Sequence, residues 1–140
     1  MDGVSKALPA ALQGFQLTRR AARIGFDWGR VEGVLEKMNE EAAELRRALA
    51  GKDTVRSEEE MGDLLFAAVN VARFLHIDPE IALKKANAKF AARFRRMEEL
   101  AAESGRALPD VPRDEMEELW NAAKRSEDRP GRQAREASKV

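Results

Sequence analysis

The sequence predicts an all-α protein, an antiparallel bundle of about five helices that is completed by oligomerisation. Ala, Leu, Glu, Lys and Arg dominate its 140 residues, tyrosine is absent, and no run of β-branched residues occurs. A helical chain of this size often completes its core with a second copy. The length predicts one helical domain over residues 1–126, and the polar, aperiodic residues 127–140 predict a disordered tail.

The first two helices are separated by a glycine-rich break. A first helix is predicted over about Pro9–Ile24, where the segment Gly-Phe-Asp-Trp-Gly at 25–29 ends it. A second helix is predicted over about Val31–Leu49. We expect Gly51 at the C′ position just beyond it, because glycine adopts left-handed backbone angles at little cost.

The third helix is predicted to begin after Thr54 or Ser57 and to run to about Leu75. A helix that is apolar on all sides is buried on all sides, and four other helices of a small chain could hardly enclose it. We therefore infer a subunit interface along this helix. Its apolar residues are Met61, Leu64, Leu65, Phe66, Ala67, Ala68, Val69, Val71, Ala72, Phe74 and Leu75.

The fourth and fifth helices are bounded by proline and glycine. Asp78 and Pro79 predict an N-cap followed by proline at the first helical position. The fourth helix then continues to Ala102 and stops before Gly105. Beyond a loop at 109–112, a fifth helix carries apolar residues at helical spacing, namely Met116, Leu119, Trp120 and Ala123.

Composition restricts the classes of function. The 25 basic residues balance the 25 acidic ones, which argues against binding of a nucleic acid polymer or a membrane surface. Cysteine is absent, so a metal would have to rest on oxygen ligands or on the single His76. The chain shows neither a signal peptide nor the roughly 20 consecutive apolar residues of a membrane span. We therefore expect a cytoplasmic protein.

Two acidic motifs lie on the predicted second and third helices, Glu40-Glu41-Ala42-Ala43-Glu44 and Glu60-Met61-Gly62-Asp63. Residues three apart lie on one helical face, so Glu41 pairs with Glu44 and Glu60 pairs with Asp63. The connection between the two helices is short, which predicts antiparallel packing. The two pairs of carboxylates are therefore expected to face each other.

Four converging carboxylates would repel one another unless a cation were bound. Oxygen-only ligands suit Mg²⁺ or, alternatively, Mn²⁺. Asp63 supports a metal site, because a charge inside a strongly apolar segment is costly without a partner. Gly62 leaves room for close packing or for a phosphate. The alternative is that these acids form a solvated helix surface and that Ser57 and Glu60 form a capping box.

The acidic motifs resemble those of the MazG family of all-α nucleoside triphosphate (NTP) pyrophosphatases, whose signature is E-E-x-x-E followed by E-x-x-D. The resemblance covers about Leu17–Arg125. Over this range the chain is most similar to the catalytic, C-terminal half of two-domain MazG proteins. Its further matches are RAARIGFDW, EEEMGDLLFAAVNVARFL, KKANAKFAARFRRME and MEELWNAAK.

The resemblance implies a role for each matching residue. Glu41, Glu44, Glu60 and Asp63 would be the magnesium ligands. Glu40 would lie beside them, where it would either support the ligands or help to orient water. Lys89 and Arg93 on the fourth helix would hold the triphosphate. Trp120 and Lys124 match nucleotide-binding positions, and Asn87 lies near the face of Lys89 and Arg93 as a further substrate-binding candidate. The N-terminal segment that closes over the site in this family is matched by Arg19, Arg20, Phe26 and Trp28.

Several of these residues also have a structural explanation. Lys89 and Arg93 fit exposed charges on an arginine-rich helix, and the spacing of Trp120 fits a core position. We assign Phe90 and Phe94 to the core, and His76 to a helix end or the surface.

The activity implied by the resemblance is Mg²⁺-dependent hydrolysis of NTPs to a nucleoside monophosphate and pyrophosphate, which clears unwanted nucleotides. The family also implies a homodimer or a dimer of dimers. One alternative is a narrower enzyme for dUTP and dCTP. Another is a non-catalytic helical oligomer that binds nucleotide or protein. Such degenerate relatives would have lost acids or the Lys89–Arg93 pair, and this chain retains them all.

Overall fold

The computed structural model describes residues 3–127, which form five α-helices and one short 3₁₀ helix and contain no strand. The predicted all-α class is therefore confirmed. The chain divides between Lys84 and Lys85 into two compact units. Helix α4 (Pro79–Glu103) begins in the first unit and continues into the second. The tail predicted at 127–140 lies, beyond its first residue, outside the described residues.

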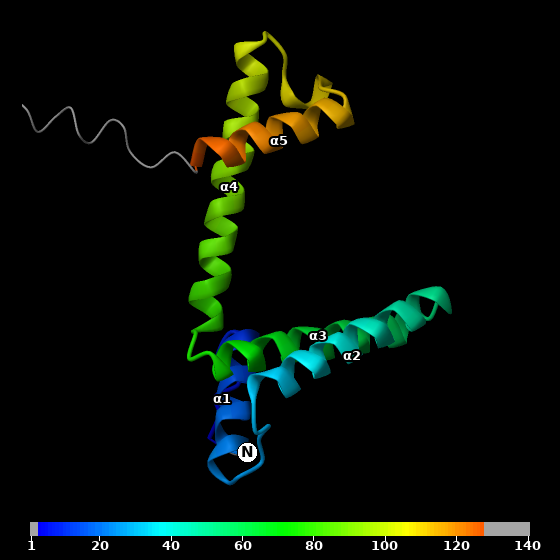
Figure 1. The fold of residues 1–140 in the computed structure, drawn as a ribbon, viewed down its shortest axis with the longest axis vertical. Helices are drawn as coiled ribbons and strands as arrows, with labels where there is room; N and C mark the ends of the chain where they lie inside the picture. The colour runs from blue at the N-terminus through cyan, green and yellow to red at the C-terminus, as the bar shows by residue number, and fades with distance from the viewer. Residues whose placement is uncertain (1–2, 128–140) are drawn as a thin grey trace, which may run out of the picture. The chain divides into compact units, whose positions relative to one another are not determined.

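The first unit is built on two neighbouring helices, α2 (Val31–Ala50) and α3 (Thr54–Phe74). They pack side by side and antiparallel, because only residues 51–53 join them (Figure 1). Helix α1 (Ala10–Arg23) packs near the end of α3. A Cβ atom on its Gly14 would lie 3.5 Å from the side chains of Phe66 and Val69, so this buried glycine brings the two backbones close together.

The end of α2 differs from the prediction in one residue. Gly51 is the C-cap and has right-handed backbone angles, whereas Lys52 takes the left-handed position with φ 56°. The amide of Lys52 donates to the carbonyl of Leu49, and that of Asp53 donates to Ala48, both at 3.1 Å. This hydrogen-bond pattern is a Schellman motif with lysine at C′. The helix ends where predicted, but the C′ assignment to Gly51 is wrong.

Helix α3 begins at an aspartate cap. The Asp53 carboxylate accepts the backbone N–H of Arg56 at 3.0 Å. Ser57 lies one turn inside the helix, and its hydroxyl donates to the Asp53 carbonyl at 2.6 Å. The alternative explanation of Glu60 as part of a capping box is therefore wrong, because Ser57 is not the N-cap.

The helix ends around residues 75–79 follow the prediction. His76 is exposed, has φ 56°, and completes the C-terminal turn of α3 by donating its amide to the carbonyl of Arg73. Asp78 caps α4, because its carboxylate accepts the amide of Ile81 at 3.0 Å. Pro79 is the first residue of α4. The surface and helix-end assignment of His76 is confirmed.

The second unit contains most of α4, the 3₁₀ helix η1 (Leu108–Asp110) and α5 (Arg113–Glu127). Its core consists of Met97, Ala101, Leu108, Val111 and Ala123, against which Met116, Leu119 and Trp120 pack. Phe90 and Phe94 do not belong to this core. They are 59% and 42% exposed, so their assignment to the core is wrong.

Helix α3 exposes part of its apolar surface within a single chain. Met61 and Phe66 are partly exposed, and Leu65 is 61% exposed. The other helices of the first unit therefore do not enclose α3, as its composition predicted. The subunit interface itself stays a prediction. Along the described residues, no helix combines the length and the apolar character that crossing a membrane requires.

Candidate functional site

Three acidic side chains meet between α2 and α3. Glu41 of α2 and Glu60 and Asp63 of α3 each place a carboxylate oxygen within 4.8 Å of the other two. Glu41 and Glu60 are only 5% and 7% exposed, whereas Asp63 is exposed. The antiparallel pairing of the helices brings Glu41 to the level of the Glu60–Asp63 turn. The expected convergence of the two acidic motifs is thus present for three residues.

Two basic side chains bond to the buried acids, and the sequence analysis did not identify them. Lys37 Nζ lies 2.7 Å from Glu41 and 3.3 Å from Glu40. Arg56 Nε donates to Glu60 at 3.1 Å. The hydrogen bond to Glu41 raises the pKa of Lys37, and the hydrogen bond to Glu60 raises that of Arg56. Spacing of four residues within one helix is the signal that would have found both pairs.

The remaining acids of the motifs lie outside the cluster. Glu44 bonds instead to Arg47, whose guanidinium donates to it at 3.0 Å. Glu40 is exposed beside Lys37. Among the described residues, the carboxylate of Asp63 has no hydrogen bond or ion pair. The cluster therefore has two buried acids that each bond to one base, and one acid that faces solvent.

A divalent cation fits this arrangement. The donors are all carboxylate oxygens, which hard cations such as Mg²⁺, Mn²⁺ and Ca²⁺ prefer. Two buried carboxylates and a third nearby need positive charge to offset their repulsion, and Lys37 and Arg56 supply it to the two buried acids but not to Asp63. A Cβ atom on Gly62 would meet no atom within 4 Å, so Gly62 leaves open space beside the acids and does not serve close packing within the chain.

The predicted nucleotide-binding residues of α4 and α5 belong to the second unit. Lys89 and Asn87 are exposed, and Arg93, Trp120 and Lys124 are partly buried. The Arg93 guanidinium lies 5.7 Å from the ring centre of Trp120, a cation–π contact. Trp120 also packs against the core of this unit, so its structural explanation is confirmed in part.

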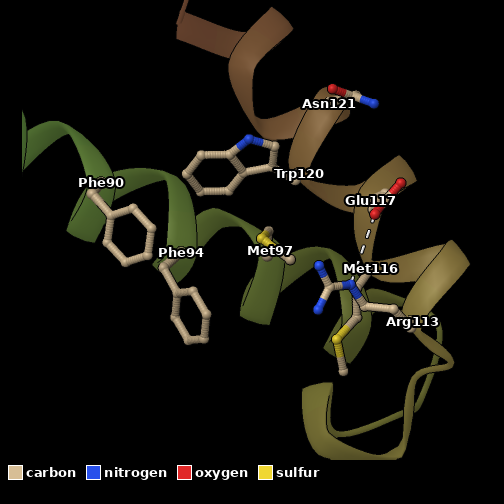
Figure 2. Close-up of a pocket in the computed structure, with 8 residues that line it drawn as sticks. All are labelled: Phe90, Phe94, Met97, Arg113, Met116, Glu117, Trp120 and Asn121. Carbon is tan, nitrogen blue, oxygen red and sulfur yellow. Dashed lines mark ion pairs between the residues drawn. The ribbon is translucent and has the colours of Figure 1, made fainter. Parts of the chain in front are cut away.

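A hollow of about 550 Å³ lies beside Trp120 (Figure 2). The rings of Phe90 and Trp120 are 5.4 Å apart, and those of Phe90 and Phe94 are 6.1 Å apart. Figure 2 shows the two phenylalanines projecting from α4 beside the indole from α5. Aromatic surface of this kind suits a flat, apolar ligand with polar edges. The other residues that line this hollow are Met97, Arg113, Met116, Glu117 and Asn121.

The N-terminal residues of the predicted site lie in the first unit. Arg19 and Arg20 are exposed and, with Arg23, line a hollow of about 440 Å³ beside residues 3–8. Phe26 and Trp28 are exposed on the loop between α1 and α2. A Cβ atom on Gly33 would lie 2.9 Å from the indole of Trp28, so the ring lies against the start of α2.

Bacterial proteins of known name are similar to most of this chain. A protein named nucleoside triphosphate pyrophosphohydrolase/pyrophosphatase MazG, from Thermotoga maritima, is 45% identical over 121 residues, which cover 86% of this chain and 46% of that protein. The nucleoside triphosphate pyrophosphohydrolase of Escherichia coli K12 is 43% identical over 131 residues, 91% of this chain and 49% of that protein. The chain therefore spans about half the length of these curated relatives.

A shorter similarity covers the acidic motifs. The uncharacterized protein YabN of Bacillus subtilis is 53% identical over 70 residues, half of this chain and 14% of that protein. The model of the MazG nucleotide pyrophosphohydrolase domain matches residues 30–99, which include α2, α3 and the acid cluster. With half of its length matched in this way, the chain belongs to the MazG nucleotide pyrophosphohydrolase domain family.

Proposed function

We propose that this chain hydrolyses nucleoside triphosphates to a nucleoside monophosphate and pyrophosphate, and that the reaction depends on Mg²⁺. Mn²⁺ is the alternative ion. The observation that carries the proposal is the convergence of Glu41, Glu60 and Asp63 within 4.8 Å in a chain of the MazG family. The names of the bacterial relatives support the same reaction.

Glu41, Glu60 and Asp63 would hold the ion, with Glu44 as a fourth ligand once its carboxylate leaves Arg47. The bound ion supplies positive charge against the charge that develops on the leaving pyrophosphate. Lys37 and Arg56 bond to two of the same carboxylates, so the ion would compete with them for Glu41 and Glu60. Glu40 is exposed next to the cluster, where it can accept a proton from a water molecule or orient it.

The chain offers further groups for the substrate. Lys89, Arg93 and Lys124 would supply positive charge to the phosphates. Asn87 would donate a hydrogen bond, and Trp120 would contact the base from the edge of the aromatic hollow. Arg20 and Trp28, in the N-terminal part, would close over the nucleotide.

We also propose a homodimer or a dimer of dimers that acts in the cytoplasm without binding a nucleic acid polymer or a membrane. The exposed apolar residues of α3, Met61, Leu65 and Phe66, support the assembly. The balance of 25 basic and 25 acidic residues supports the absence of a polyanionic partner.

Pyrophosphate release from a panel of NTPs and dNTPs, with and without Mg²⁺, tests the reaction. The wild type should release pyrophosphate only with the metal, and Glu41→Gln should lose this activity while keeping its helicity. Glu99→Gln removes an exposed acid from an ion pair with Arg96 and serves as the matched control, which should keep full activity. Equal activity in Glu41→Gln would reject the site.

The same panel separates the alternatives. Turnover of dUTP and dCTP far above that of the other nucleotides would replace broad NTP hydrolysis with the narrower activity. No release from any nucleotide by a folded protein in the presence of Mg²⁺ would favour a non-catalytic binding protein.

A further inference from the structure

An arginine–aspartate pair outside the acid cluster ties the loop between α1 and α2 to α3. Arg73 donates from its two terminal nitrogens to the two oxygens of Asp27, at 2.6 and 3.0 Å. Its Nε donates to the buried side-chain oxygen of Asn70 at 2.8 Å, and its guanidinium lies 5.0 Å from the ring centre of Phe74. Only 11% of the Arg73 side chain is exposed. A two-pronged pair of this kind fixes orientation as well as distance.

Asp27, held by Arg73, also restrains the backbone of its neighbour Trp28. The Asp27 carboxylate also accepts the backbone N–H of Trp28 at 2.9 Å. The indole then lies where a side chain on Gly33 would project, because a Cβ atom there would come within 2.9 Å of it. Despite these contacts Trp28 remains 41% exposed. The loop therefore holds a large aromatic ring against α2 with part of its surface available.

Trp28 lies in line with the candidate metal site. Gly33, Lys37 and Glu40 occupy successive turns on one face of α2. Lys37 reaches from this face to Glu41 at 2.7 Å. From Gly33 to Glu41 the helix rises roughly 12 Å, at about 1.5 Å per residue. A nucleotide with its phosphates at the acids can extend along this face toward the indole.

We propose that Arg73 and Asp27 are positioning residues, which hold Trp28 for contact with the nucleoside part of the substrate. This inference rests on the proposed function. Arg73 and Asp27 contribute through Trp28 and do not touch the substrate. Base–aromatic stacking tolerates different bases, so the arrangement strengthens binding of many NTPs alike.

Steady-state kinetics with Arg73→Gln, Asp27→Asn and the double variant test the positioning role. Loss of Trp28 contact should raise KM roughly tenfold, with kcat nearly unchanged. The double variant should be no worse than either single one, because all three break the same link. Trp28→Leu should reproduce the effect with the ion pair intact. A change in kcat with KM unchanged would overturn the inference. So would a double variant whose KM rises by the combined effects of the two single variants.

Arg96→Gln is the matched control, since it removes an arginine that bonds to two exposed glutamates, Glu99 and Glu103. It should keep the wild-type KM. Arg73→Lys retains the charge without the two-pronged geometry and should show an intermediate KM. If Arg73→Gln does not fold, Asp27→Asn and Arg73→Lys carry the comparison.

A binding experiment separates this inference from the proposed reaction. The chain has two tryptophans, so Trp120→Phe leaves Trp28 as the only one. Titration of this variant with Mg²⁺ and α,β-methylene ATP should change the Trp28 fluorescence emission. Adding Arg73→Gln should raise the nucleotide concentration at the midpoint roughly tenfold. An unchanged emission, or an unchanged midpoint, would overturn the positioning role. Because this titration needs no turnover, it decides the inference even for a chain that hydrolyses no NTP.

Discussion

Asp63 differs from the other two acids of the cluster because it is exposed and, among the described residues, has no ion-pair partner. Its carboxylate is therefore the one most available to a cation. Asp63→Asn keeps the shape but removes the charge, and should weaken Mn²⁺ binding by at least the roughly 10–100-fold that loss of a hydrogen-bond partner of a metal ligand costs. Titration calorimetry with Mn²⁺ measures this directly. Asp110→Asn, an exposed acid of η1, is the control, and equal Mn²⁺ affinity in Asp63→Asn would remove this residue from the site.

Lys37 gives the cluster a pH dependence. Its hydrogen bond to Glu41 raises its pKa above the ordinary 10.5. Because the folded state binds this proton more tightly than the unfolded state, the stabilisation is fully present below pH 10.5 and is lost as pH rises through the raised pKa. The effect is modest, since Lys37 is partly exposed and solvent screens the pair.

Urea unfolding of wild type and Lys37→Met between pH 8 and pH 12 measures this contribution, because the range brackets the ordinary lysine pKa of 10.5. The difference in unfolding free energy between the two proteins should shrink toward the top of this range. A difference that stays constant would show that the Lys37–Glu41 hydrogen bond does not stabilise the fold.

At the scale of the elements, the start of α3 sets the position of two metal-ligand candidates. Asp53 caps the helix by accepting the amide of Arg56, and Glu60 and Asp63 follow within three turns. Asp53→Ala should lower the unfolding free energy by about 1 kcal/mol, whereas Asp53→Asn should cost little because asparagine also caps well. Chemical denaturation measures both. Equal losses in the two variants would point to the charge of Asp53 and not to its cap.

The elements themselves follow from local signals. The helix boundaries at Asp78–Pro79 and near Gly105 were predicted because capping and backbone geometry depend on a few adjacent residues. The left-handed residue after α2 was assigned to Gly51 but is Lys52. A shift of one residue depends on how far α2 extends before α3 packs against it, which the local sequence does not specify.

At the scale of the whole molecule, the apolar surface of α3 predicts assembly. Leu65 is 61% exposed in the single chain, and Met61 and Phe66 lie exposed on the same helix. Burial of such side chains is worth about 1.5–3 kcal/mol each, so a second copy would gain by covering them. Light scattering coupled to gel filtration should find a dimer or larger at micromolar concentration, and Leu65→Asp should shift it toward monomer. A monomeric wild type would refute the interface.

The sequence by itself determined the five helices, the two acidic motifs and the pairing of Glu60 with Asp63, because helix formation and spacing of three or four residues are local properties. Only the tertiary structure decided that Glu41 joins Glu60 and Asp63 while Glu44 bonds to Arg47. The tertiary structure also placed Phe90 and Phe94 on the surface, and it paired Asp27 with Arg73, 46 residues away. Contacts between elements depend on how each helix is rotated about its axis and on which rotamers its side chains adopt. Those choices are made by packing, so no short stretch of sequence contains them.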